Sequence, residues 1–308
     1  MSREAVHQAV RDLVWSIFTE LGVPGVIRHH RHVAIDPEPI VVVAPSFFDL
    51  DPRLRDQVYG WCATHADRLS VSRLRGLLRQ LPAPARTAFG AFAATLSAHA
   101  GLRWPTAGVE PWTYAPAVKP PGLPVHRPAL VRLRLRALSG VGARADVLAE
   151  LIARSASWTR ASDLADEGYS KRAIAGVLSE LSAAGMTSQA SERNAIIYRL
   201  CRPDLLRDLA GANALAFPSW RMLMVVVLML MVLTRLQGRA DAVKRVEANK
   251  LNDALRPLCA RLGLVMAPAT RGNPRAWEDM MSWAALVSGQ FAERVGRTAP
   301  DPLGGQAW

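Results

Sequence analysis

The residues best suited to chemistry in this sequence are polar and cationic side chains at the start of one short helix. Ser170, Lys171 and Arg172 open the segment Lys171–Ala184, whose apolar residues recur with helical spacing. A serine directly before a helix accepts a hydrogen bond from one of its first amides. Lysine and arginine donate hydrogen bonds to phosphates and to guanine edges. The pattern predicts a helix with a charged leading end.

A second group has residue types that bind metal ions: His29, His30 and His32, with Asp36 and Glu38 nearby. A metal site requires a defined ligand geometry, and the intervening segment is short and interrupted by proline, so an exposed basic loop is the better interpretation. The chain contains no phosphate-binding loop, nucleophile elbow, zincin helix or glycine-rich dinucleotide turn. We therefore expect neither an enzyme nor a bound metal or cofactor.

Two further groups of arginines leave alternatives open. The first group is Arg132, Arg134 and Arg136, which alternate with apolar residues. This alternation fits a strand with one basic face, a supplementary phosphate-binding stripe or a solvated edge. The second lies in Pro52–His65 and Ser70–Leu81, a pair that faintly resembles a helix-turn-helix and is equally well explained as a packed helical bundle. Its charge comes from three arginines: Arg73, Arg75 and Arg79.

The elements that position these residues are predicted to be mainly helical. Apolar periodicity predicts the following helices outside the central segment: Ser2–Leu21, Pro52–His65, Ser70–Leu81, Phe89–His99, Pro203–Leu209, Leu251–Leu262 (interrupted at Pro257) and Met280–Val295. Asp51 and Ser70 are predicted N-caps. The β-branched run Ile40–Ala44 predicts a buried strand. The apolar run Met222–Leu233 would span only about 18 Å as a helix, against about 30 Å of bilayer hydrocarbon, so we expect it buried in a core or a dimer interface.

The central segment, residues 143–200, begins with two predicted helices. Ala143–Ala153 has one apolar stripe, and Trp158–Asp166 follows as a shorter helix with Thr159 as its candidate N-cap. The turn Glu167–Tyr169 leads into the third helix, Lys171–Ala184. Its Gly168 suits the positive φ that a tight helix-to-helix corner often needs.

A hairpin completes this segment. Gly185 suits the C-terminal end of the third helix. Beyond it, Met186–Ala190 pairs with Ile196–Leu200 through the turn Ser191–Asn194. The predicted order is therefore helix, helix, turn, helix and hairpin, the order of a winged helix-turn-helix.

In this order of elements, and in the sequence SASWTRASDLADEGYSKRAIAGVLSELSAAGMTSQASERNAIIYRL, the segment resembles the winged-helix domains of MarR- and ArsR-type bacterial transcriptional regulators. It also resembles the winged-helix domains of AbiEi-type antitoxins, which in that family repress their own operon. The resemblance covers about residues 143–200 and implies nothing about the regions on either side.

The resemblance implies that the third helix enters the major groove of double-stranded DNA, which admits one α-helix. The residues facing the bases or phosphates would then be Ser170, Lys171 and Arg172, followed along the helix by Ala175 and Ser179. At the tip of the hairpin, Arg193 and Asn194 would lie over the backbone or the minor groove, where arginine is attracted. Arg160 is a candidate phosphate contact.

Composition is compatible with this interpretation. The 308 residues carry a formal net charge of +12, and half of the chain is apolar, which excludes disorder and favours a polyanionic partner. The basic excess is spread over the whole chain rather than gathered in a tail. The N-terminus lacks the features of a signal peptide, and three widely spaced cysteines suit a reducing compartment, so we expect a cytoplasmic protein.

The predicted fold class is mainly α with a small β-hairpin, an α+β arrangement in which a winged helix-turn-helix domain is flanked by helical regions. The expected division is a helical N-terminal domain over 1–103, a proline-rich linker over 104–128, the winged domain over 129–202 and a helical region over 203–308. We expect a homodimeric transcriptional regulator. The alternative is an antitoxin-like subunit that binds a cognate enzyme and regulates its own operon.

Overall fold

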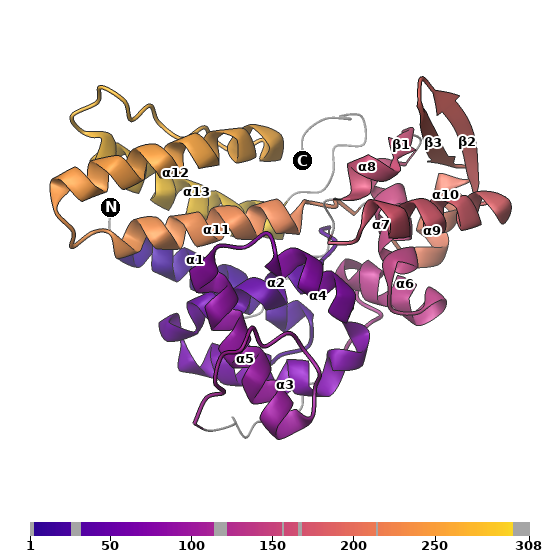
Figure 1. Cartoon of the computed structure of the whole chain (residues 1–308), viewed down its shortest axis with the longest axis horizontal. Coiled ribbons are helices and arrows are strands. Elements are labelled where there is room, and N and C mark those ends of the chain that lie inside the picture. Colours follow the sequence, from indigo (N-terminus) through magenta and orange to yellow (C-terminus); the bar gives the residue numbers. More distant parts are fainter. Residues whose placement is uncertain are drawn as a thin grey trace.

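Helices make up most of the protein. The computed structural model describes residues 3–25, 32–113, 122–155, 157–165, 168–213 and 215–297, with side chains described through residue 290. Within these ranges lie thirteen α-helices and one three-stranded antiparallel sheet (Figure 1), so the predicted fold class is confirmed as mainly helical with a small sheet. The helices are α1 (Arg3–Glu20), α2 (Pro37–Val43), α3 (Pro52–His65), α4 (Val71–Leu78), α5 (Ala83–Ala100), α6 (Val131–Ser139), α7 (Ala143–Arg154), α8 (Ala161–Leu164), α9 (Lys171–Ala183), α10 (Pro203–Ala210), α11 (Trp220–Arg235), α12 (Asp241–Leu262) and α13 (Ala276–Arg297). The strands are β1 (Thr159–Arg160), β2 (Thr187–Glu192) and β3 (Ala195–Leu200).

One hydrophobic core joins the two ends of the chain. Helices α1–α5 share it with α11, α12 and α13, so N-terminal and C-terminal segments form a single helical body (Figure 1). Leu223, Val227 and Leu230 on α11 are fully or almost fully buried in this core, which confirms the predicted burial of the Met222–Leu233 run. None of the helices in the described ranges combines the length and the hydropathy needed to cross a bilayer.

A second, smaller core lies under α6–α10 and the sheet, which form the lobe at the right of Figure 1. The two cores meet at α6. Leu133 on this helix packs into the core of the helical body, and Leu135 packs into the core of the lobe. α6 is therefore shared between the body and the lobe.

A buried cluster of ion pairs occupies the junction of body and lobe. Its cations are Arg73 on α4 and Arg132 and Arg136 on α6. Its carboxylates are Asp36 and Glu38 at the start of α2 and Asp146 on α7. All six side chains are at most 4% exposed. This buried ion cluster balances three positive charges with three negative charges between elements that are far apart in sequence.

The geometry of the buried ion cluster is specific. Arg73 donates to Glu38 at 3.0 Å and to both carboxylate oxygens of Asp36. Arg136 donates to Glu38 and to Asp146, each at 2.8 Å. Arg132 lies 3.5 Å from Asp146 and also donates to Glu150, a neighbour that is 14% exposed. Each carboxylate therefore contacts at least two arginines, and Asp146 contacts all three, which fixes the orientation of α6 and α7 against α2 and α4.

The expectation of a buried strand at Ile40–Ala44 is wrong, because Pro37–Val43 forms α2. Pro37 stands at the first helical position, where proline is favoured, and all seven residues of the helix are buried. A helix buried on every side shows no polar–apolar periodicity, and its β-branched run then suggests a strand. Tertiary burial, together with the contacts of Glu38 to two arginines, overrides the local β propensity.

None of the interpretations of Arg132, Arg134 and Arg136 as a strand face, a phosphate stripe or a solvated edge is correct. The three residues lie on α6, where positions i and i+4 share a face, and Arg132 and Arg136 point into the buried ion cluster. Arg134 leaves the helix on another side and donates to backbone carbonyls, including those of Val125 and Ala210. All three arginines join parts of the chain to one another.

The proline-rich passage is held against the body where it is described. The Trp112 ring packs at 5.9 Å from Phe48 and 5.7 Å from Phe92, between ring centroids. Tyr114 of the same passage lies outside the described residues. α12 continues through Pro257 rather than being interrupted there.

The buried ion cluster predicts a pH dependence of stability. Burial opposes ionisation of Asp146, but the guanidinium groups of Arg136, Arg73 and Arg132 outweigh it and hold the pKa of Asp146 well below its usual range. A carboxyl with a depressed pKa in the folded state stabilises the fold above its unfolded pKa of about 3.9, and this contribution is lost as pH falls further. We expect the free energy of unfolding, measured with urea, to fall between pH 5 and pH 3.

Asp146→Asn tests the origin of that dependence. Removing one partner of a buried ion pair costs about 3–5 kcal/mol, and the variant should lose less stability than the wild type between pH 5 and pH 3. Glu180→Gln is the matched control, because Glu180 pairs with Arg144 at the surface and such pairs contribute less than about 1 kcal/mol. Equal losses in the two variants would contradict the role assigned to the cluster.

Candidate nucleic-acid interface

The helix predicted to carry the site forms as expected. Ser170 caps α9, its Oγ accepting a hydrogen bond from the Ala173 amide at 3.2 Å. Ile174, Leu178 and Leu181 are buried on the inward face of the helix. The predicted helix and its cap are therefore confirmed.

The outward face of α9 carries the predicted contact residues. Ser170, Lys171, Arg172 and Ser179 are exposed, whereas Ala175 is half-buried against the core of the lobe. No ion pair or side-chain hydrogen bond within the described residues holds Lys171 or Arg172. Two cationic groups are therefore left available at the leading end of the helix.

The turn before α9 packs against α4 of the helical body. Gly168 has φ +91°, as predicted for this corner, and its backbone faces Gly76 on α4. A β-carbon at Gly76 would lie 1.9 Å from the Gly168 carbonyl oxygen, so the two backbones approach more closely than any side chain allows. Tyr169 donates from its hydroxyl to Asp146 at 2.7 Å, which joins the turn to the buried ion cluster.

The segment before the turn differs from the prediction. Helix α8 covers only Ala161–Leu164, and Thr159 is not its N-cap because it lies in β1, paired with Tyr198. Arg160 takes the N-cap position instead, and its amide donates to Asp163 at 2.8 Å. Pairing with β3 explains the difference, because strand pairing satisfies backbone groups that an additional helical turn would otherwise use.

The hairpin forms with a tighter turn than predicted. β2 and β3 pair antiparallel from Thr187↔Leu200 to Glu192↔Ala195, which leaves Arg193 and Asn194 as the two turn residues. Both are exposed, and Arg193 adopts φ +54°, a left-handed conformation typical of two-residue hairpin turns. The predicted tip residues are at the tip.

Arg160 and Glu192 form an ion pair across the sheet. β3 lies between their strands, in the order β1-β3-β2. The hydrogen bond from Arg160 to Glu192 raises the pKa of the guanidinium and ties the hairpin to β1. Arg160 therefore has an ion-pair partner, whereas Lys171 and Arg172 have none among the described residues.

Three further arginines were not included in the predicted site. The Arg199 guanidinium lies 4.7 Å from the ring centroid of Trp158, which is 41% exposed. Arg75 on α4 and Arg79 directly after it are exposed, whereas Arg73 on the same helix is buried; α4 is the helix that contacts the α8–α9 turn. The sequence identified the α4 arginines as a charged group, but only the docking of α4 on the turn relates them to α9.

The described residues contain no group of three or more histidine, cysteine, aspartate or glutamate side chains placed to hold a metal ion. His29 and His30 of the histidine cluster lie outside the described residues, and His32 is exposed. Asp36 and Glu38 belong to the buried ion cluster.

No family model, curated protein or solved structure matches the chain.

A matched pair of glycine substitutions tests the docking of the turn. Gly76→Ala should destabilise the protein by about 1–3 kcal/mol, because the new methyl group requires backbone movement. Gly176→Ala, on the exposed face of α9 where a β-carbon meets no atom within 4 Å, should stabilise it by about 0.5–1 kcal/mol. Urea unfolding measures both. A neutral Gly76→Ala substitution would show that α4 and the turn are not in firm contact.

Proposed function

We propose that residues of the lobe form a winged helix-turn-helix that binds double-stranded DNA, and that the protein regulates transcription. The observation that carries the proposal is the exposed, cationic leading end of α9, which follows α8 across a tight turn and precedes a two-residue hairpin. The turn packs against Gly76 on α4, while Ser170, Lys171 and Arg172 just after it remain exposed. This arrangement suits insertion of one helix into a major groove.

The residues take different roles in the proposed complex. Lys171 and Arg172 donate to guanine edges or phosphates, and Ser170 fixes the start of the helix. Arg193 and Asn194, at the hairpin tip, lie over the backbone or the minor groove. Ala175 and Ser179 continue the groove-facing side, Ala175 with only part of its surface free.

Neighbouring arginines support the proposed contacts. Arg160 holds the hairpin to β1 through Glu192 and, with 43% of its side chain exposed, remains a candidate phosphate contact. Arg75 and Arg79 on α4 add positive charge beside the turn, where they contribute non-specific attraction to the phosphates.

A double substitution tests DNA binding. Lys171→Ala/Arg172→Ala removes two donors without touching the buried face of α9 and should weaken binding to the promoter of the protein's own gene by about tenfold or more. The slope of log affinity against log salt concentration should decrease by about two, one unit for each lost phosphate contact. Fluorescence anisotropy over a salt series measures both quantities.

Arg245→Ala is the control for that experiment, because it removes an exposed charge from α12, outside the lobe. It should leave affinity and salt dependence close to those of the wild type. If the Lys171/Arg172 variant binds the promoter as tightly as the wild type does, DNA binding by α9 is refuted.

We also propose that the protein is a homodimer joined through α10. Leu205 and Leu209 lie one turn apart on α10 and are 60% and 70% exposed, while Leu206 and Ala210 face the core of the lobe. A second copy that packs against the same face forms a two-fold symmetric interface, which matches the symmetry of a palindromic operator.

Light scattering after size-exclusion chromatography tests the dimer. The wild type should have twice the mass of the chain, and Leu205→Asp/Leu209→Asp should have the mass of one chain, because charge opposes burial of that face. Leu138→Asp, an exposed leucine at the end of α6, should remain dimeric. A monomeric wild type contradicts the proposed dimer and leaves DNA binding to be decided by anisotropy.

A further inference from the structure

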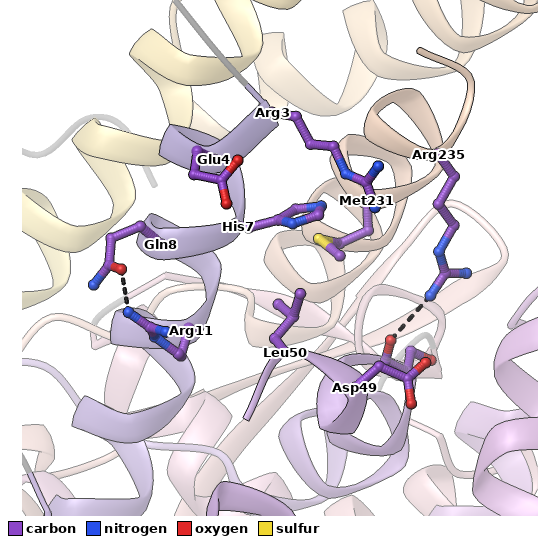
Figure 2. A pocket seen from close by; sticks show the side chains of 10 residues that line it. Arg3, Glu4, His7, Gln8, Arg11, Asp49, Leu50, Met231 and Arg235 are labelled. Carbon is purple, nitrogen blue, oxygen red and sulfur yellow. Dashed lines mark hydrogen bonds between the residues drawn. The ribbon is translucent and has the colours of Figure 1, made fainter. Parts of the chain in front are cut away.

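A surface cavity of about 380 Å³ lies in the helical body, between α1, the 3-10 helix Ala44–Leu50 and the end of α11. Figure 2 shows its lining, in which charged side chains surround a small apolar patch. The cations are Arg3, Arg11 and Arg235, and the carboxylates are Glu4 and Asp49. The remaining lining residues are His7, Gln8, Ser46, Leu50 and Met231.

The imidazole of His7 has a defined hydrogen-bonding state. The Thr234 hydroxyl donates to the Met231 carbonyl at 2.8 Å, so its oxygen accepts from His7 Nε2 at 3.0 Å. Partial burial, followed by the positive charge of Arg3, lowers the pKa of His7; Glu4 opposes this shift and Arg235 adds to it. The ring is therefore neutral at pH 7, with its proton on Nε2 and an acceptor lone pair on Nδ1.

The guanidinium groups of the cavity are only partly used by the protein. Arg3 makes no ion pair or hydrogen bond to any described residue. Arg235 donates once, to the Ser46 carbonyl at 3.2 Å. Arg11 is held by Gln8, while Glu4 and Asp49 pair with no cation in the described part of the chain. Arg3 and Arg235 thus retain several N–H donors, which suit oxyanions.

The Ser46 side chain adds an unsatisfied polar atom. Its Oγ is buried and has no hydrogen-bond partner among the described residues, which costs free energy. Leu50 and Met231 form the apolar part of the lining, and Figure 2 shows them beneath the imidazole and the Arg3 guanidinium.

We propose that this cavity binds a small organic anion, whose carboxylate or phosphate group is held by Arg3 and Arg235 and whose hydroxyl donates to His7 Nδ1. The volume suits a compound of a few carbon atoms, since it lies near the lower limit of small-molecule sites. Glu4 and Asp49 at the rim reduce the net positive charge and disfavour anions that carry no hydrogen-bond donor. The proposal concerns the helical body and stands apart from DNA binding by the lobe.

Isothermal titration calorimetry on the full chain tests the site with three probes: L-malate, succinate and inorganic phosphate. Sodium chloride at matched ionic strength is the blank. Each probe is titrated to about 10 mM, at which even a site of millimolar affinity is occupied. We expect malate to bind several-fold more tightly than succinate, because only malate carries the hydroxyl that donates to His7. Phosphate binding without carboxylate binding would identify the phosphate as the oxyanion, and the reverse would identify the carboxylate.

Variants locate the binding. Arg3→Gln and Arg235→Gln should each weaken it by about tenfold, the loss expected when a charge-assisted hydrogen bond is removed. Arg245→Gln, an exposed arginine elsewhere on the body, should leave it unchanged, and so should Lys171→Ala/Arg172→Ala, which separates this site from the proposed DNA interface. The proposal is overturned if none of the probes binds, or if Arg245→Gln weakens binding as much as Arg235→Gln does.

Discussion

The buried ion cluster is the constraint on which the arrangement of this protein depends. Three arginines and three carboxylates meet where α2, α4, α6 and α7 converge, with almost no exposure to water. Desolvating charges costs more than hydrophobic packing of the same volume would, but charges also require defined partners. A displaced lobe would leave charges unpaired in a dry environment, so the cluster favours one relative orientation of lobe and body. The turn before α9 is part of this arrangement through Tyr169.

The body and the lobe are also joined through the chain itself. α11 begins at Trp220, whose indole donates to the Ala34 carbonyl at 2.6 Å, two residues before Asp36 of the ion cluster. The same helix ends at Arg235, in the cavity proposed to bind an anion. One helix, buried along most of its length, therefore begins beside Ala34 and ends at that cavity.

Local signals were sufficient to predict the lobe's third helix and its hairpin. The Ser170 cap, the positive φ of Gly168 and the tip at Arg193 and Asn194 each depend on residues within a few positions, and all are present in the structure. The mainly helical class followed from the same kind of periodicity. Predictions failed where distant partners decide the structure. α2 lacks periodicity because every side is covered, and Arg132 and Arg136 of α6 have their carboxylate partners at the start of α2 and on α7.

The candidate site combines both kinds of information. The sequence alone predicted its cationic leading end. The folded chain was needed to find the ion pair of Arg160, the position of Arg75 and Arg79, and the contact of α4 with the turn. The cavity between α1 and α11 gave no recognisable motif, because its lining residues come from three separate parts of the sequence.

The contact between Gly76 and Gly168 has a consequence for the protein's evolution. A side chain at Gly76 would meet the Gly168 backbone, and one at Gly168, whose φ is +91°, would meet Arg73 and Leu77, so glycine is expected to be kept at both positions. A relative that retains this union of body and lobe should carry glycine at both positions, even where the surrounding sequence has diverged. The two glycines are therefore a sequence signature by which distant homologues can be recognised.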